Sequence, residues 1–128
     1  MAANPVQIQL NPFVHGAITC LSKASYFQRV TLTLPTGQVV FQGTGENVPM
    51  TYATGQGVYE LGSSAAPINV TALFEYSTSG PSGPFYTAQV QDPVPQKTPL
   101  WTIVTVTSED STDNDDNDSI LSLFVMDQ

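Results

Sequence analysis

The sequence predicts an all-β fold, a single antiparallel β-sandwich domain of about nine short strands spanning residues 1–128. Apolar and polar residues alternate with a period of two in the clearest apolar segments, as in strands with one buried face. Gly and Pro separate the apolar segments at short intervals, as turns between antiparallel strands require. No stretch of ten residues shows the 3.6-residue period of an amphipathic helix.

The expected strands follow one another closely along the chain. The alternation is clear in residues 6–10, where Val6, Ile8 and Leu10 share a face, and it recurs at 30–34 and 103–107. Runs rich in β-branched and aromatic residues predict the remaining strands. These are 13–19, 38–42, 50–53, 58–61, 68–76, 85–91 and 119–126. Turn residues lie between them, including Pro-Thr-Gly at 35–37 and Pro-Val-Pro at 93–95.

The composition excludes several kinds of partner. The formal net charge is −8, and the only cationic side chains are Lys23, Arg29 and Lys97. Three scattered cations cannot form the basic surface that nucleic acid requires, so we expect no nucleic-acid binding. No run approaches the roughly 20 apolar residues of a membrane-spanning helix, which argues against membrane insertion.

The start of the chain bears on where the protein is made. Its first twenty residues contain neither Lys nor Arg and no long apolar run, unlike a secretory signal peptide. We therefore expect cytoplasmic synthesis without a signal peptide. Export to the cell surface or to the extracellular space by another route stays open.

The acids of the chain are concentrated in one short segment. Glu109, Asp110, Asp113, Asp115, Asp116 and Asp118 place six of the eleven acids within ten residues. The strands expected on either side hold both ends of this segment, so the carboxylates repel one another unless a cation neutralises them. Carboxylate and amide oxygens in this number suit Ca²⁺, and the supply fits two adjacent ions better than one. A solvated acidic loop without metal is the alternative.

The acidic segment resembles the calcium loop of a bacterial lectin family. Residues 108–118 read Ser-Glu-Asp-Ser-Thr-Asp-Asn-Asp-Asp-Asn-Asp. The two-calcium fucose/mannose-binding lectins, the LecB family, carry Ser-Glu-Asp-Gly-Thr-Asp-Asn-Asp-Tyr-Asn-Asp. Nine of the eleven positions match, and in both cases ten further residues lead to the end of the chain.

This resemblance implies a non-catalytic sugar-binding protein whose sugar hydroxyls coordinate two Ca²⁺ ions per site. The carried-over metal ligands are Glu109, Asp113, Asp115, Asn117 and Asp118. Asp110 matches a residue that accepts hydrogen bonds from the sugar. In the family the terminal carboxylate of a neighbouring subunit completes the metal site. Here that carboxylate belongs to Gln128, so a homodimer or higher homo-oligomer is implied.

A second segment lines up with the family more weakly. Lys23, Ala24, Ser25 and Tyr26 stand where the family has Asn-Ser-Ser-Gly or a similar sequence. The family Asn is a calcium ligand, a role that Lys23 can take only through its backbone carbonyl. The three residues after it tune the choice between fucose and mannose. Ala24, Ser25 and Tyr26 are therefore candidate sugar-binding residues, and Tyr26 replaces a small residue.

The leading hypothesis is thus a calcium-dependent lectin for glycans of the fucose or mannose type. A calcium-stabilised β-sandwich that serves adhesion or assembly without binding sugar is the alternative, and a partner-binding sandwich without metal is a third. Glycoside hydrolysis by paired carboxylates is disfavoured, because acids bound to calcium leave no general acid. We expect Cys20 to be a small buried hydrophobe and His15 to be structural or on the surface.

Overall fold

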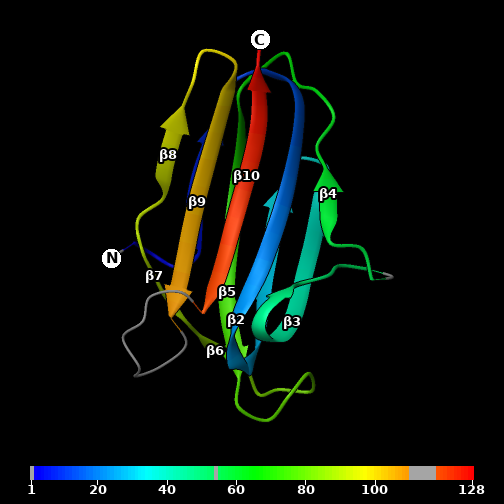
Figure 1. Cartoon of the computed structure of the whole chain (residues 1–128), viewed down its shortest axis with the longest axis vertical. Coiled ribbons are helices and arrows are strands. Elements are labelled where there is room, and N and C mark those ends of the chain that lie inside the picture. Colours follow the sequence, from blue (N-terminus) through cyan, green and yellow to red (C-terminus); the bar gives the residue numbers. More distant parts are fainter. Residues whose placement is uncertain (1, 54, 110–117) are drawn as a thin grey trace.

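The computed structural model describes residues 2–53, 55–109 and 118–128, and every regular element among them is a strand (Figure 1). The strands are β1 (Val6–Leu10), β2 (Phe13–Leu34), β3 (Gly37–Pro49), β4 (Val58–Glu60), β5 (Ile68–Ser77), β6 (Tyr86–Thr87), β7 (Gln89–Val90), β8 (Val94–Lys97), β9 (Trp101–Glu109) and β10 (Ser119–Asp127). All their pairings are antiparallel. No helix of membrane-spanning length occurs in this described part of the chain.

The long strand β2 gives the molecule its two layers. Its first part, from Phe13 to Ser22, pairs with β10, whereas its second part, from Phe27 to Thr33, pairs with β5. The register of the β2–β3 pairing shifts between these two parts of β2. Residues 23–26 therefore form a corner at which the chain passes from one layer to the other. One layer then holds β4, the first part of β2, β10 and β9, and the other holds β3, the second part of β2, β5 and β1 (Figure 1).

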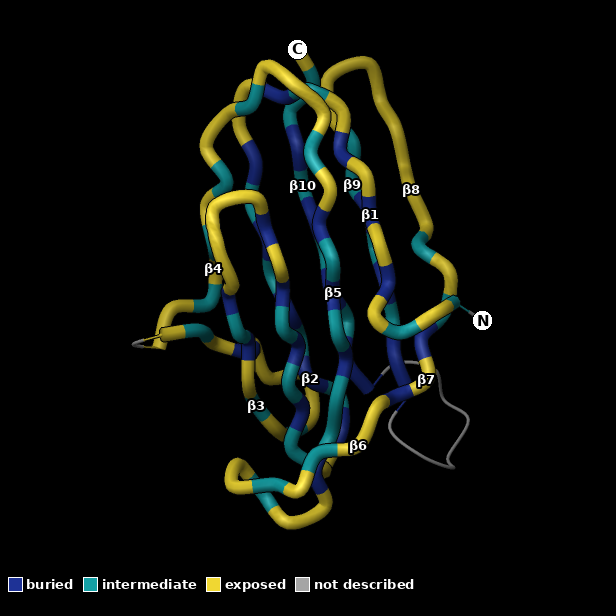
Figure 2. The backbone as a smooth tube through the Cα atoms, turned by 180° about the vertical axis from the view of Figure 1, so that it is seen from behind, coloured by how far each residue is buried: buried dark blue, intermediate teal, exposed yellow. Residues whose placement is uncertain are grey.

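The core lies between the two layers and follows the period-two alternation. In β10 the inward residues Leu121, Leu123 and Val125 are at most 1% exposed, and burial alternates in the same way along the other long strands (Figure 2). Phe41 and Phe74 are the bulkiest contributors from the opposite layer. Burial of these rows is the main stabilising contribution to the fold, since apolar burial scales with the area removed from water.

Cys20 belongs to this core, as predicted. Its side chain is 3% exposed, and burial raises the pKa of the thiol well above its usual range. The protonated thiol is therefore the form present at neutral pH, and it packs as a small apolar group.

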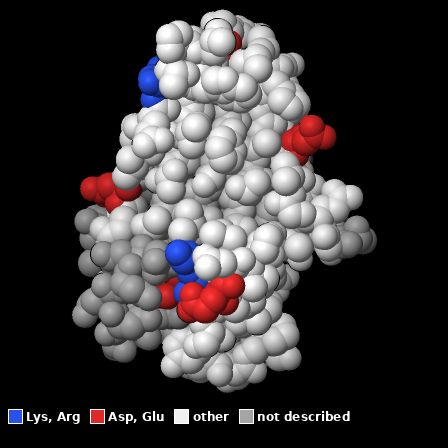
Figure 3. Space-filling view, in the orientation of Figure 1, with Lys and Arg blue, Asp and Glu red and all other residues white. Residues whose placement is uncertain are grey.

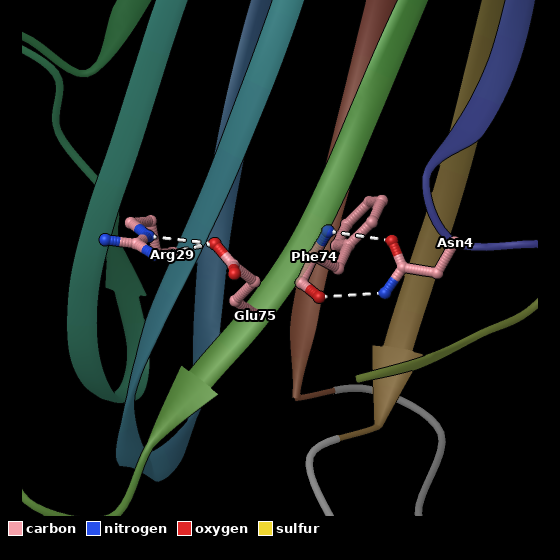
Figure 4. Close-up of polar contacts among 4 residues, drawn as sticks. All are labelled: Asn4, Arg29, Phe74 and Glu75. Atoms are coloured by element: carbon pink, nitrogen blue, oxygen red, sulfur yellow. Dashed lines mark hydrogen bonds and ion pairs between the residues drawn. The ribbon is translucent and has the colours of Figure 1, made fainter. Parts of the chain in front are cut away.

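Polar side chains fasten the edges of the layers. Asn4 donates to the carbonyls of Phe74 and Ala88, both at 2.8 Å, and its Oδ1 accepts from the Phe74 amide at 3.1 Å (Figure 4). It thereby joins the N-terminal segment to β5 in place of a strand pairing. On β2 and β5, Arg29 forms an ion pair with Glu75 at 2.8 Å between Nη2 and Oε1 (Figure 4).

The sandwich prediction is confirmed, whereas several predicted strand boundaries were wrong. The expected strands 13–19 and 30–34 are two parts of one strand, because the residues between them continue the pairing around the corner. Residues 50–53 form only isolated bridges, and 85–91 is interrupted at Ala88. The Pro-Val-Pro segment, expected as a turn, begins β8, an edge strand in which Pro95 is tolerated.

Candidate functional site

The buried polar residues of the described chain gather at one end of the sandwich. Three inward-facing apolar rows end in a serine there: Cys20 is followed on its face by Ser22, Val106 by Ser108, and Leu121 is preceded by Ser119. The complete set is Ser22, Gln28, Ser77, Ser108, Glu109, Asp118 and Ser119, all at most 4% exposed. This polar end lies beside the β2 corner, where β9 ends and β10 begins (Figure 1).

Two carboxylates of the acidic segment belong to this polar end. Glu109 is the last residue of β9 and is 4% exposed, and Asp118 directly precedes β10 and is 0% exposed. The Asp118 amide donates to the Ser108 carbonyl at 2.7 Å, which extends the β9–β10 pairing up to the segment. Burying ionised carboxylates costs several kcal/mol unless a nearby positive charge compensates for it, so this geometry suits a bound cation.

Two buried hydroxyls support the same interpretation. The Oγ atoms of Ser22 and Ser108 have no hydrogen-bond partner among the described residues. A buried polar atom in that state costs roughly 1–3 kcal/mol. Oxygen atoms are the donors that hard divalent cations prefer, so this end of the core fits Ca²⁺ better than a softer metal.

The β2 corner is joined directly to the end of the acidic segment. The Lys23 amide donates to the Asp118 carbonyl at 2.9 Å. Ala24 is 5% exposed, whereas Ser25 and Tyr26 are exposed. The structure thus brings the four predicted corner residues next to one predicted metal ligand, and it leaves Ser25 and Tyr26 open to solvent.

Gln28 is a residue of this site that the sequence reasoning missed. It is 0% exposed, accepts a hydrogen bond from Ser119 Oγ at 2.9 Å, and donates from Nε2 to the Tyr26 carbonyl at 3.2 Å. Gln28 therefore connects the start of β10 to the corner. A signal was present, because Gln28 stands on the same face as Val30 and Leu32, where the alternation calls for an apolar residue.

Other predicted ligands lie elsewhere. Asp110, Asp113, Asp115 and Asn117 fall outside the described residues, and within the described part no three metal-ligating side chains cluster. Gln128 follows β10 at its far end, about 30 Å from Asp118 at the usual rise per strand residue (Figure 1). Gln128 is therefore remote from the polar end of its own chain.

The fold is shared with solved sugar-binding proteins. Similar structures include the Chromobacterium violaceum lectin CV2L in complex with alpha-methyl-fucoside, with a TM-score of 0.68, 20% identity and 96% of each chain covered. The Ralstonia solanacearum high-affinity mannose-binding lectin has a TM-score of 0.67, 21% identity and coverage of 95% of this chain and 96% of that chain. The C-terminal domain of the Burkholderia cenocepacia lectin BC2L-C has a TM-score of 0.58, 20% identity and 97% coverage of each chain.

The family comparison extends over nearly the whole sequence. No curated protein matches the chain. The family described as fucose-binding lectin II (PA-IIL), however, matches residues 8–127, which include the β2 corner, the acidic segment and β10. Lectins bind carbohydrate without transforming it, in agreement with the prediction that the protein is not an enzyme. The chain belongs to the fucose-binding lectin II family.

Proposed function

We propose that the protein is a calcium-dependent lectin that binds sugars of the fucose or mannose type through two Ca²⁺ ions. The observation that carries this proposal is the pair of buried carboxylates, Glu109 and Asp118, that bracket the acidic segment of a fucose-binding lectin family member. The solved lectins with this fold, one in complex with alpha-methyl-fucoside and one described as mannose-binding, support the choice of sugar.

The proposal assigns a role to each candidate site residue. The metal ligands are Glu109, Asp113, Asp115, Asn117 and Asp118, of which four carry a charge of −1. They match the charge of two Ca²⁺ ions. Bound calcium supplies a fixed positive charge that attracts pairs of sugar hydroxyls more strongly than water does. Asp110 accepts a sugar hydroxyl hydrogen, and the exposed corner residues Ser25 and Tyr26 form a wall of the site.

A calcium-stabilised module without sugar binding is the second candidate. It is favoured by one observation: the carboxylates of Glu109 and Asp118 are buried in the end of the core, where an ion would order the strand ends whether or not a sugar follows. Both candidates require calcium, so only the sugar distinguishes them.

Isothermal titration tests the proposal. With Ca²⁺ present, we expect saturable binding of L-fucose or D-mannose, and we expect the signal to vanish in EDTA and to return when calcium is added back. Galactose and Mg²⁺ serve as the sugar and metal controls. Calcium binding without any sugar signal, on a glycan array as well, would favour the second candidate.

The site also points to a dimer. Because Gln128 lies about 30 Å from the polar end of its own chain, this residue can reach such an end only in a second copy of the chain. The outer face of β9 and β10 offers a surface for that copy: Phe124 pairs with Ile103 and Met126 with Trp101. Figure 3 shows this face almost without charged side chains, which gather at its margins. Neutral, partly apolar faces are common in homodimer interfaces.

A charge placed on this face is expected to separate the copies. Phe124→Glu puts a carboxylate at the centre of β10's outer face, and we expect a monomer by sedimentation velocity where the wild type is a dimer. Calcium affinity is expected to fall at least tenfold in the same variant, because the second copy no longer contributes to the site. Gln7→Glu adds the same charge to the exposed face of β1 and is expected to leave the dimer intact. A wild type that is monomeric at micromolar concentration would contradict the dimer.

A further inference from the structure

Three tyrosines form a continuous row of rings beside the polar end. Tyr26 stacks on Tyr76 with ring centroids 6.0 Å apart and planes 18° apart, and Tyr76 meets Tyr86 at 5.7 Å and 40°. The two outer members are open to solvent, Tyr26 at 37% and Tyr86 at 48% exposed. Tyr76 packs against the core and supports both of them. We call these three residues the tyrosine row.

The row connects segments that reach both ends of the acidic segment. Tyr26 lies three residues after Lys23, whose amide bonds to the Asp118 carbonyl. Tyr86 lies three residues before Gln89, which pairs with Glu109 in the β7–β9 ladder. The row is therefore carried by the segments that hold the two ends of the acidic segment.

The backbone of the corner holds Tyr26 in place. Its carbonyl accepts hydrogen bonds from Gln28 Nε2 at 3.2 Å and from Thr44 Oγ1 at 3.3 Å. Thr44 Oγ1 also donates to the Ser25 carbonyl at 2.8 Å. These bonds fix the backbone at Tyr26 while its ring stacks on Tyr76, so the ring loses little conformational freedom when a ligand binds.

The other end of the row is held by its neighbour Phe85. The Arg29 guanidinium carbon lies 3.5 Å from the Phe85 ring centroid, and Phe27 meets the same ring edge-on at 6.2 Å. Glu75 pairs with Arg29 at 2.8 Å, and because the Arg29–Glu75 pair is adjacent to the Gln28–Tyr76 pair in the ladder, this cluster lies on the opposite face of the layer from Tyr76. The chain that carries Tyr86 is thereby anchored through Phe85.

From these observations we propose that the tyrosine row is a second subsite, which binds the sugar residue attached to the one held at the calcium site. Aromatic faces carry a partial negative charge and attract the C–H groups on the apolar face of a pyranose ring. The phenol hydroxyls can exchange hydrogen bonds with sugar hydroxyls at the rim. This inference rests on the proposed lectin function, and it makes a disaccharide a better ligand than its terminal monosaccharide.

The test is the ratio of two dissociation constants. Titrations with Ca²⁺ compare methyl α-L-fucoside with α1,2-, α1,3-, α1,4- and α1,6-linked fucosyl disaccharides, and methyl α-D-mannoside with the corresponding mannobioses. We expect at least one disaccharide to bind about fivefold to tenfold more tightly than its methyl glycoside, because one aromatic contact contributes a free energy that corresponds to this ratio. Tyr86→Ser is expected to bring that ratio close to one, whereas Tyr86→Phe, which keeps the ring, retains it.

The outcomes separate the two proposals. Tight methyl glycoside binding with no gain for any disaccharide would overturn the subsite and leave the lectin function standing. A ratio that does not change in Tyr86→Ser would overturn it as well. If Tyr86→Ser instead changes the sedimentation coefficient, the row is a contact between copies of the chain, and the subsite is wrong. Absence of binding by every sugar would overturn the lectin function itself.

Discussion

Removing calcium is expected to lower the melting temperature of the protein by about 10–20 °C. A ligand present at a thousand times its dissociation constant stabilises the folded state by about 4 kcal/mol. In a domain of this size each kcal/mol shifts the melting temperature by roughly 3–5 °C. In the proposed function the buried carboxylates of Glu109 and Asp118 bind that ligand, and acids confined at one end of the core repel one another without it. Differential scanning calorimetry in 1 mM Ca²⁺, and then in EDTA, measures the shift.

Two controls make this result specific. Mg²⁺ at the same concentration is expected to restore little of the lost stability, because it is smaller and demands stricter octahedral geometry than a site of flexible oxygen ligands provides. Added salt is expected to raise the melting temperature of the EDTA sample slightly, because it screens the repulsion among the acids. An identical melting temperature with and without calcium would show that the acidic segment is only a solvated loop.

The fold was predictable because burial follows the strands with a period of two. In β1 the residues predicted to share a face, Val6, Ile8 and Leu10, are those that the structure buries. The strand ends were harder to predict. Residues 23–26 continue β2 around a corner because β3 pairs with it at Ala24 and β5 pairs with it from Phe27 onward, and long-range pairings of that kind leave no local signal. Val94 and Pro95 form a strand only because β9 offers an edge.

The site was predictable in one respect and not in another. The sequence placed Glu109 and Asp118 in one acidic segment, a local property of the chain, and the structure buries both at the polar end. Gln28, by contrast, is 91 positions away from its hydrogen-bond partner Ser119, so no local sequence motif predicts this hydrogen bond. Its polar side chain on an apolar face was the available clue, and such a residue needs a buried partner.

A neutral isostere at Asp118 is expected to affect the calcium-bound and calcium-free proteins in opposite directions. Asp118→Asn keeps the shape of a side chain that is 0% exposed but removes one charge from the acidic segment. Without calcium, we expect the variant to melt several degrees higher than the wild type, because the repulsion among the remaining acids is weaker. With calcium, we expect it to melt lower, because calcium affinity falls about a hundredfold or more when an anionic ligand is lost.

Calorimetry of both proteins in calcium and in EDTA gives the four melting temperatures that this prediction needs, and calcium titration gives the affinities. Asp92→Asn is the matched control: it removes the same charge from an exposed acid outside the acidic segment, so all four temperatures should stay within about 2 °C of the wild type. If Asp118→Asn lowers stability equally in both buffers, the carboxylate serves the packing of the strand ends rather than a metal. A variant that keeps its calcium affinity would remove Asp118 from the ligand set.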